Sequence, residues 1–437
     1  MTAVLGAAED RGARQDPSAL AAMIETSVLP CGIRLVTEAM PDTVSATVGF
    51  WVGTGSRDER DDQAGISHFL EHLLFKGTPT RSARSIAEDI DAVGGDMNAY
   101  TTKEYTTFYV RLLGKDLELG LDVLSDIMWN PALRPSEVDA ERQVILEEVL
   151  MHLDEPADLV HERCAETMFP GHPLGREVLG LPEVITSVRV DAIRAFLDLH
   201  YRPGNIVVSA AGKVDHEALA SGLEARFAGE RTGERPVRTA PAAPLAGLDV
   251  LNRETEQAHL VLGLRAPSRE SDQRFALSLL NHSLGGGLSS RLFQKIREER
   301  GLCYSIGSDR IAYEDAGALT IGVGTSPDNA HEVLRLVTQE LEELAENGVS
   351  DRELALAKGH VEADTLLSLE DSGARMSRIG ASMLLHGYVL DIDDLTARIM
   401  AVTREDIAAV AKDVLGGPRV LAVVGPFDEE DFADAIG

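Results

Sequence analysis

The alternation of hydrophobic and polar positions predicts an ordered series of strands and helices in the first half of the chain. Residues 43–53 alternate with a period of two, which is typical of a half-buried strand, and apolar positions three and four apart predict helices. Strands are predicted at residues 43–53, 96–100, 105–111 and 205–212, and helices at 66–75, 86–93 and within 115–200.

The second half repeats this order. Strands are predicted at residues 258–264, 302–310, 318–323 and 419–425, and helices at 275–284, 289–299 and within 329–415. The closing runs of the two halves, VVSAAGKVD at 207–215 and LAVVGPFD at 421–428, also correspond. We interpret the chain as two tandem homologous α+β domains.

A segment without periodicity separates the two halves. Residues 229–247 are rich in Pro, Gly, Ala and charge, which is typical of a linker. The predicted division is a disordered leader (1–24), a first α+β domain (25–230), a linker (231–250) and a second homologous domain (251–437).

Composition narrows the functional classes. The 437 residues suffice for two domains, and the net charge of −31 disfavours nucleic acid as a partner. The acidic balance fits a solvated surface, or an acidic cavity that attracts basic peptides. No apolar run is long enough for a membrane span, the N-terminus lacks the pattern of a secretory signal, and three scattered cysteines fit a reducing cytoplasm. We therefore expect a cytoplasmic protein with no membrane or nucleic-acid partner.

The segment His68-Phe69-Leu70-Glu71-His72 carries the strongest chemical signal. In a helix, His68 and His72 lie one turn apart on one face, so both imidazoles can reach one metal ion. Glu71 lies near that face, where a carboxylate can accept a proton from an attacking water. This is the inverted form of the His-Glu-x-x-His zinc motif. The alternative is an amphipathic helix with incidental histidines.

A catalytic zinc ion needs a third protein ligand. The helical run 136–153 offers Glu141, Glu147 and Glu148, and the seven-residue spacing places Glu141 and Glu148 on one face. Spacing alone does not choose between Glu147 and Glu148, and an acidic solvent-facing surface is the simpler reading of all three.

Three segments together resemble the pitrilysin and mitochondrial processing peptidase family of zinc metallopeptidases: residues 66–78, 95–101 and 141–148. The resemblance extends over about residues 35–425. It implies that His68, His72 and Glu148 bind one Zn²⁺ per chain and that Glu71 is the general base. It also implies that Glu141 is a second acidic residue that supports catalysis at the site.

The resemblance also implies substrate-binding residues in both halves. Asn98 and Ala99 correspond to the strand edge on which family members bind a peptide substrate as an added strand. Arg297 and Tyr304 resemble a pair that holds the substrate carbonyl and the transition-state oxyanion. Taken singly, Asn98 reads as a turn-prone residue, Arg297 as a helix-end charge and Tyr304 as a strand aromatic.

The function expected from this resemblance is endopeptidase activity on unfolded peptides. Family members of this size form half of a four-domain clamshell, so a homodimer enclosing a chamber is implied. The alternatives are a non-catalytic subunit, because the family includes inactive members, and a heterodimer whose second chain supplies the Arg297/Tyr304 function. All zinc-motif residues are present here, which favours an active enzyme.

Overall fold

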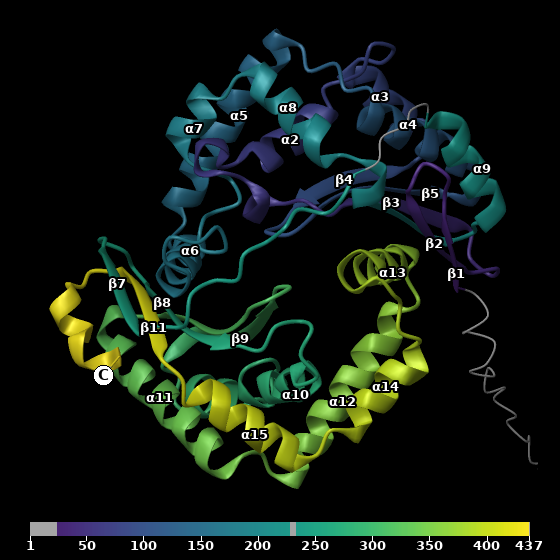
Figure 1. Ribbon diagram of the computed structural model, residues 1–437. Coiled ribbons are helices and arrows are strands. Elements are labelled where there is room, and N and C mark those ends of the chain that lie inside the picture. The colour runs from purple at the N-terminus through teal and green to yellow at the C-terminus, as the bar shows by residue number, and fades with distance from the viewer. Residues whose placement is uncertain (1–23, 228–232, 437) are drawn as a thin grey trace, which may run out of the picture.

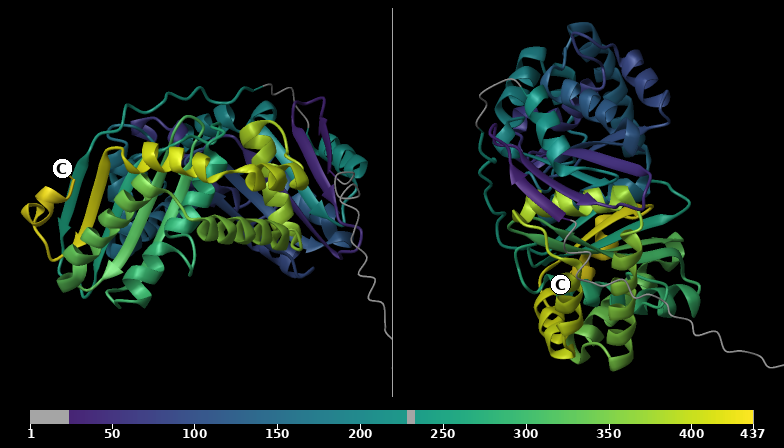
Figure 2. Two further views of the ribbon diagram at one scale, coloured as in Figure 1. Left: turned by 90° about the horizontal axis from the view of Figure 1, so that it is seen from below. Right: turned by 90° about the vertical axis from the view of Figure 1, so that its right-hand side faces the viewer.

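The computed structural model describes residues 24–227 and 233–436, which form two halves that each contain one sheet (Figure 1). The right-hand view of Figure 2 shows the first half above the second. Of the predicted leader only Ile24 lies within the described residues, and it begins the first strand.

The first sheet has six strands in the order β1-β2-β6-β3-β5-β4. Only the neighbours β2 and β6 are parallel, and the other pairs are antiparallel. Its strands are β1 (Ile24–Val28), β2 (Arg34–Ala39), β3 (Ser45–Val52), β4 (Asp96–Thr101), β5 (Thr106–Leu113) and β6 (Ile206–Gly212). The helices of this half are α2 (Ile66–Leu74), α3 (Ala83–Asp91), α4 (Leu117–Trp129), α5 (Pro135–Asp154), α6 (Pro156–Met168), α7 (Pro182–Ser187), α8 (Val190–His200) and α9 (His216–Arg226).

The second sheet repeats this pattern in the order β7-β11-β8-β10-β9, again with one parallel pair, β7 and β11. Its strands are β7 (Gly247–Asn252), β8 (Ala258–Ala266), β9 (Cys303–Ala312), β10 (Gly317–Thr325) and β11 (Arg419–Gly425). Its helices are α10 (Arg274–Leu284), a π-helix (Phe293–Glu298), α11 (Ala330–Asn347), α12 (Asp351–Ser368), α13 (Ser372–His386), α14 (Ile392–Ala401) and α15 (Arg404–Leu415). The matching strand orders confirm the prediction of two tandem homologous domains with mostly antiparallel sheets.

The sequence patterns did not predict every element. Strands β1 and β2 and helix α9 were not expected, and β7 begins at Gly247, inside the segment predicted as linker. Strands β2 and β7 were missed because each is short and pairs in parallel with a strand about 170 residues away in sequence.

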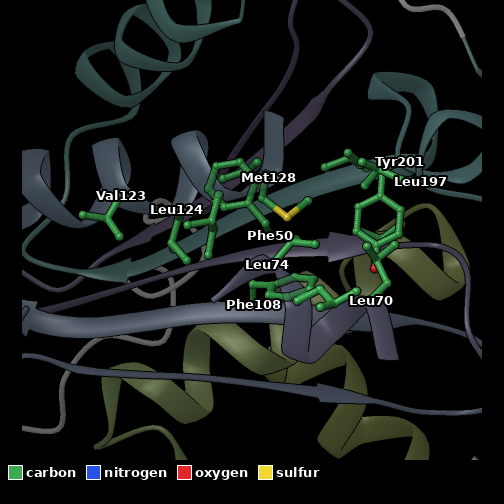
Figure 3. Close-up of a cluster of buried hydrophobic side chains, with 14 of the residues drawn as sticks. Phe50, Leu70, Leu74, Phe108, Val123, Leu124, Met128, Leu197 and Tyr201 are labelled. Carbon is green, nitrogen blue, oxygen red and sulfur yellow. The ribbon is translucent and has the colours of Figure 1, made fainter. Parts of the chain in front are cut away.

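Helices α2, α4 and α8 cover one face of the first sheet over a continuous apolar core. Figure 3 shows its centre, where Phe50 of β3 and Phe108 of β5 lie among Leu70, Met128 and neighbouring side chains. This packing fixes the position of α2, whose polar face carries His68 and His72.

The other face of each sheet is covered by a helix from the opposite half. Helix α6 of the first half packs on β7, β8 and β11, whereas α13 of the second half packs on β2, β3 and β6. Both helices lie between the two sheets (Figure 1). Their apolar side chains join two buried clusters that each contain residues from both halves.

Strand glycines allow these helices to approach closely. A Cβ at Gly49 of β3 would lie 2.6 Å from Sδ of Met376, and a Cβ at Gly263 of β8 would lie 2.7 Å from Sγ of Cys164. Each fully buried Met or Leu side chain contributes roughly 1.5–3 kcal/mol to stability. Separating the halves would expose several of them, so this packing stabilises both halves. Within the described part of the chain, no helix combines the length and apolar character needed to cross a bilayer.

Candidate metal centre

Helix α2 begins at a glycine and a buried carboxylate. Its N-cap residue, Gly65, has φ = 94°, and a Cβ there would lie 2.7 Å from the backbone of Gly180. The Glu59 side chain accepts hydrogen bonds from the N–H groups of Gly65 and Ser67, both at 2.8 Å. Burial raises the pKa of Glu59 to about 7, against the lowering effect of these hydrogen bonds. The carboxylate thereby satisfies helix donors immediately before His68.

The two histidines point their Nε2 atoms toward each other. These atoms are 3.2 Å apart, and the ring centroids are separated by 4.6 Å. Burial and the neighbouring His72 lower the pKa of His68 to about 4, so its imidazole is neutral near pH 7. A neutral imidazole is the form that binds a metal ion.

Helix α5 brings a third candidate ligand atom to the two histidines. Oε2 of Glu148 lies 3.8 Å from Nε2 of His68 and 3.6 Å from Nε2 of His72. The three residues form a group with metal-binding spacing, whereas Glu147 is exposed. Of the two candidates that spacing left open, Glu148 is the one that lies beside the two histidines.

The donor set fits zinc. Oε2 of Glu148 is buried and has no hydrogen-bond partner among the described residues. An unpaired buried carboxylate oxygen is costly, and a cation between it and the two imidazoles would satisfy it. Two histidines and a carboxylate are a ligand set of catalytic zinc sites, which leave one position open for water.

Glu71 projects from the same helix toward the edge of the first sheet. Oγ1 of Thr101, the last residue of β4, donates a hydrogen bond to Oε2 of Glu71 at 2.5 Å. Burial raises the pKa of Glu71, and the charge of Glu148 adds to this effect, while Thr101 and His72 oppose it. A carboxyl group with a raised pKa beside a metal site suits proton transfer.

Glu141 connects to the centre through His72. Nδ1 of His72 donates to Oε1 of Glu141 at 2.8 Å, and Nζ of Lys76 lies 2.6 Å from the other carboxylate oxygen. With its proton held on Nδ1, His72 presents the Nε2 lone pair to the centre.

Asn98 and Ala99 lie on β4, which is the edge strand of the first sheet. Asn98 faces solvent, and Ala99 packs partly against the core beneath α2. Met97, Ala99 and Thr101 therefore share the face toward α2, and no described strand pairs with the outer edge of β4.

Arg297 and Tyr304 lie together in the second half. The guanidinium carbon of Arg297 is 5.5 Å from the centroid of the Tyr304 ring, and Tyr304 is 75% exposed. Helix α2 packs against α5, α8 and β4, whereas β9, which carries Tyr304, packs against β10 and α10. Figure 1 shows these two regions in opposite halves. The structure thus brings His68, His72, Glu148, Glu71 and Glu141 together and leaves the Arg/Tyr pair apart from them.

A second cluster has a different balance of charge. His152, Glu162 and Glu177 also offer ligand atoms near one another. However, Nε2 of His152 is 3.1 Å from Glu162, and the charge of both glutamates acts on the buried ammonium of Lys103. Burial lowers the pKa of Lys103 and the two glutamates oppose this effect, so a lysine already balances part of the acidic charge of this cluster.

Sequence reasoning missed three residues around the centre: Glu59, Lys76 and Thr101. Lys76 lies just beyond the end of α2, within the segment 66–78 that carries the family resemblance, so its position near the motif could have indicated it. The contacts of Glu59 and Thr101 arise from packing between segments, and no spacing rule predicts them.

The chain belongs to the M16 family of peptidases. Residues 34–181 match the insulinase family, peptidase family M16, and residues 187–360 match the M16 inactive domain. This confirms the resemblance drawn from the motifs.

Relatives cover nearly the whole chain. It is 44% identical to an uncharacterized zinc protease of Streptomyces coelicolor, over 93% of this chain and 90% of that protein. Identity to an uncharacterized zinc protease of Mycobacterium tuberculosis is 42%, covering 94% and 95% of the two chains. For one of Bacillus subtilis the identity is 36%, covering 92% and 98%.

Two crystal structures share the fold. A protease from Helicobacter pylori has a TM-score of 0.84 at 23% identity, covering 92% of this chain and 99% of that one. A peptidase M16 inactive domain from Pseudomonas fluorescens has a TM-score of 0.86 at 20% identity, covering 93% and 98%.

The geometry predicts different effects for the three acidic residues of α5. Glu148→Gln is expected to weaken zinc binding by more than about 100-fold, because losing an outer-shell partner alone costs about 10–100-fold. Glu147→Gln, at an exposed position, is the matched control and should bind zinc as the wild type does. Glu141→Gln, which removes the hydrogen-bond partner of His72, should lower the rate and weaken zinc binding by no more than about 10–100-fold. Competition with a chromogenic chelator measures each affinity, and zinc loss in Glu147→Gln instead would contradict the assignment.

Proposed function

We propose that the chain is a zinc-dependent endopeptidase that hydrolyses internal bonds of unfolded peptides. The observation that carries this proposal is the convergence of His68, His72 and Glu148, with the carboxylate of Glu71 on the same helix. The names of the zinc protease relatives agree with it. A chain without a bound metal would leave the buried oxygen of Glu148 without a partner among the described residues.

Each residue has a chemical task in this proposal. Zinc, when bound, supplies a Lewis acid that polarises water and the substrate carbonyl. Glu71 takes a proton from the attacking water as its oxygen bonds to the carbonyl carbon, and gives a proton to the amine as the C–N bond breaks. Thr101 orients Glu71, and Glu141 orients His72.

Substrate binding follows from the edge position of β4. An extended peptide can pair with its free edge at Asn98 and Ala99, which directs alternate side chains toward α2. The scissile bond then lies beside the zinc ligands and Glu71.

The oxyanion remains to be bound, and we place this task on the Arg297/Tyr304 pair of a second copy. Within one chain the pair and the metal centre lie in opposite halves. A homodimer in which each second half faces its partner's first half would complete two sites and enclose a chamber.

Replacing the base tests the proposed reaction. Glu71→Gln should retain stoichiometric zinc but lose at least about 100-fold, and up to about 10,000-fold, in peptidase rate, because the amide cannot accept the proton. Digestion of a mixed peptide library, read by mass spectrometry, measures the rate, with Glu147→Gln as the control. Absence of cleavage by the wild-type, zinc-loaded protein would favour the non-catalytic alternative.

Mixing two inactive variants tests the shared site. A dimer of one Glu71→Gln chain and one Arg297→Ala chain should contain one intact site, formed by the first half of one chain and the second half of the other. Activity should return to roughly a quarter of the wild-type value after random exchange of subunits. Exchange shown by differential labelling without recovered activity would mean that the pair acts within its own chain.

A further inference from the structure

Three consecutive residues with buried side chains, Arg57, Asp58 and Glu59, precede α2, and each contacts a different part of the chain. Glu59 accepts hydrogen bonds from the start of α2. Nη2 of Arg57 lies 2.6 Å from the carboxylate of Asp315 in the second half. Asp58 accepts two hydrogen bonds from Arg238 of the connecting segment, at 2.9 and 2.8 Å. The loop before α2 therefore contacts the first half, the connecting segment and the second half.

Glu104 lies at the centre of these contacts, in the turn between β4 and β5, and is 3% exposed. Nη1 of Arg57 donates to Oε1 of Glu104 at 2.6 Å, and Nη1 of Arg269 donates to Oε2. Nη1 of Arg238 is 3.6 Å from the carboxylate, and its Nη2 donates to the backbone carbonyl of Glu104 at 2.7 Å.

The three arginines come from three parts of the chain. Arg57 belongs to the first half, Arg238 to the segment that joins the halves, and Arg269 to the second half. Burial alone would raise the pKa of Glu104, but Arg269 and Arg238 keep it below its ordinary value. Glu104 is thus an anion that joins the halves at this point.

The turn that carries Glu104 is also fixed to the loop before α2. The N–H of Ser56 donates to the carbonyl of Thr102 at 3.1 Å, and the N–H of Arg57 donates to that of Lys103 at 2.7 Å. Gly55 permits this approach, because a Cβ there would collide with the carbonyl oxygen of Thr102.

The same turn ends the strand that contacts the general base. Thr101, which donates to Glu71, precedes Glu104 by three residues. Arg57, which pairs with Glu104, precedes Glu59 by two. Displacement of Glu104 would therefore affect both the orientation of Glu71 and the start of the zinc helix.

We infer that Glu104 is a positioning residue. Through Glu104, the packing of the two halves against each other sets the position of α2 and the orientation of Glu71. The inference rests on the proposed zinc site. The second half then has a role within its own chain, because Arg269, Glu314 and Asp315 contribute to the support of the first half's metal centre.

Another buried carboxylate provides a matched control. Glu38 of β2 is 2% exposed and pairs with Arg375 and Arg378 of α13, so it also joins the two halves. Unlike Glu104, it contacts neither the loop before α2 nor the β4–β5 turn. Removing either charge takes an ion-pair partner from the arginines at these contacts, so both changes should lower stability.

The test compares Glu104→Gln with Glu38→Gln in the full-length protein. Thermal unfolding of the zinc-free proteins should show a lower Tm for both variants. Chelator competition should show zinc affinity weakened by about 10-fold or more for Glu104→Gln, the scale of lost outer-shell support, and within about twofold of wild type for Glu38→Gln. Equal zinc affinities in the two folded variants would overturn the inference.

A milder variant covers the case in which Glu104→Gln does not fold. Asp315→Asn removes only the charge that holds Arg57 to the second half, and the Asp315 side chain is 25% exposed. Its zinc affinity should fall about threefold, and kcat should fall with KM unchanged; unchanged affinity and kcat would contradict the coupling.

Wild-type protein that binds no zinc would overturn the proposed function as well, whereas zinc binding that is equal in all variants would overturn this inference alone.

Discussion

The convergence of two imidazole nitrogens and one carboxylate oxygen in a partly buried space is the constraint on which the site depends. Nε2 of His68 and His72 and Oε2 of Glu148 lie within 4 Å of one another, and the oxygen has no other partner among the described residues. Such a group is unfavourable unless a cation joins it. The surrounding contacts all maintain this arrangement: Glu59 at the start of α2, Glu141 on His72 and Thr101 on Glu71.

The two copies of the duplicated fold are not independent, and the second contributes contacts beside the candidate metal centre in the first. Each sheet receives a covering helix from the opposite half, and the ionic cluster around Glu104 joins the halves beside the site. In the second half, α10 occupies the position of α2 but carries Asn281 and His282 without the complete motif. The second copy packs against the first. In our proposals it also supports the metal centre and binds the oxyanion of a partner's substrate.

The sequence predicted the parts of this picture that depend on local spacing. The histidine pair follows from a one-turn separation in a helix, and the repeated order of strands and helices follows from periodicity. Spacing did not separate Glu147 from Glu148, because the choice depends on how α5 is rotated against α2. The family resemblance named Glu148, and the packing of α5 turns it inward.

Other features depend on contacts between distant segments, so no local pattern predicts them. The apolar positions of α6 and α13 indicate helices that are buried, but they do not say which sheet each helix covers. The same holds for Glu104: a lone glutamate in a hairpin turn reads as a solvent-exposed charge, and only the folded chain shows its three arginines.

X-ray absorption at the zinc K-edge of the purified, zinc-reconstituted protein tests the central claim most directly. The account predicts one zinc per chain, with a first shell of two imidazole groups and oxygen donors and no sulfur. A shell that contains sulfur or fewer than two imidazoles, or a protein that does not retain zinc at unit stoichiometry, would contradict it.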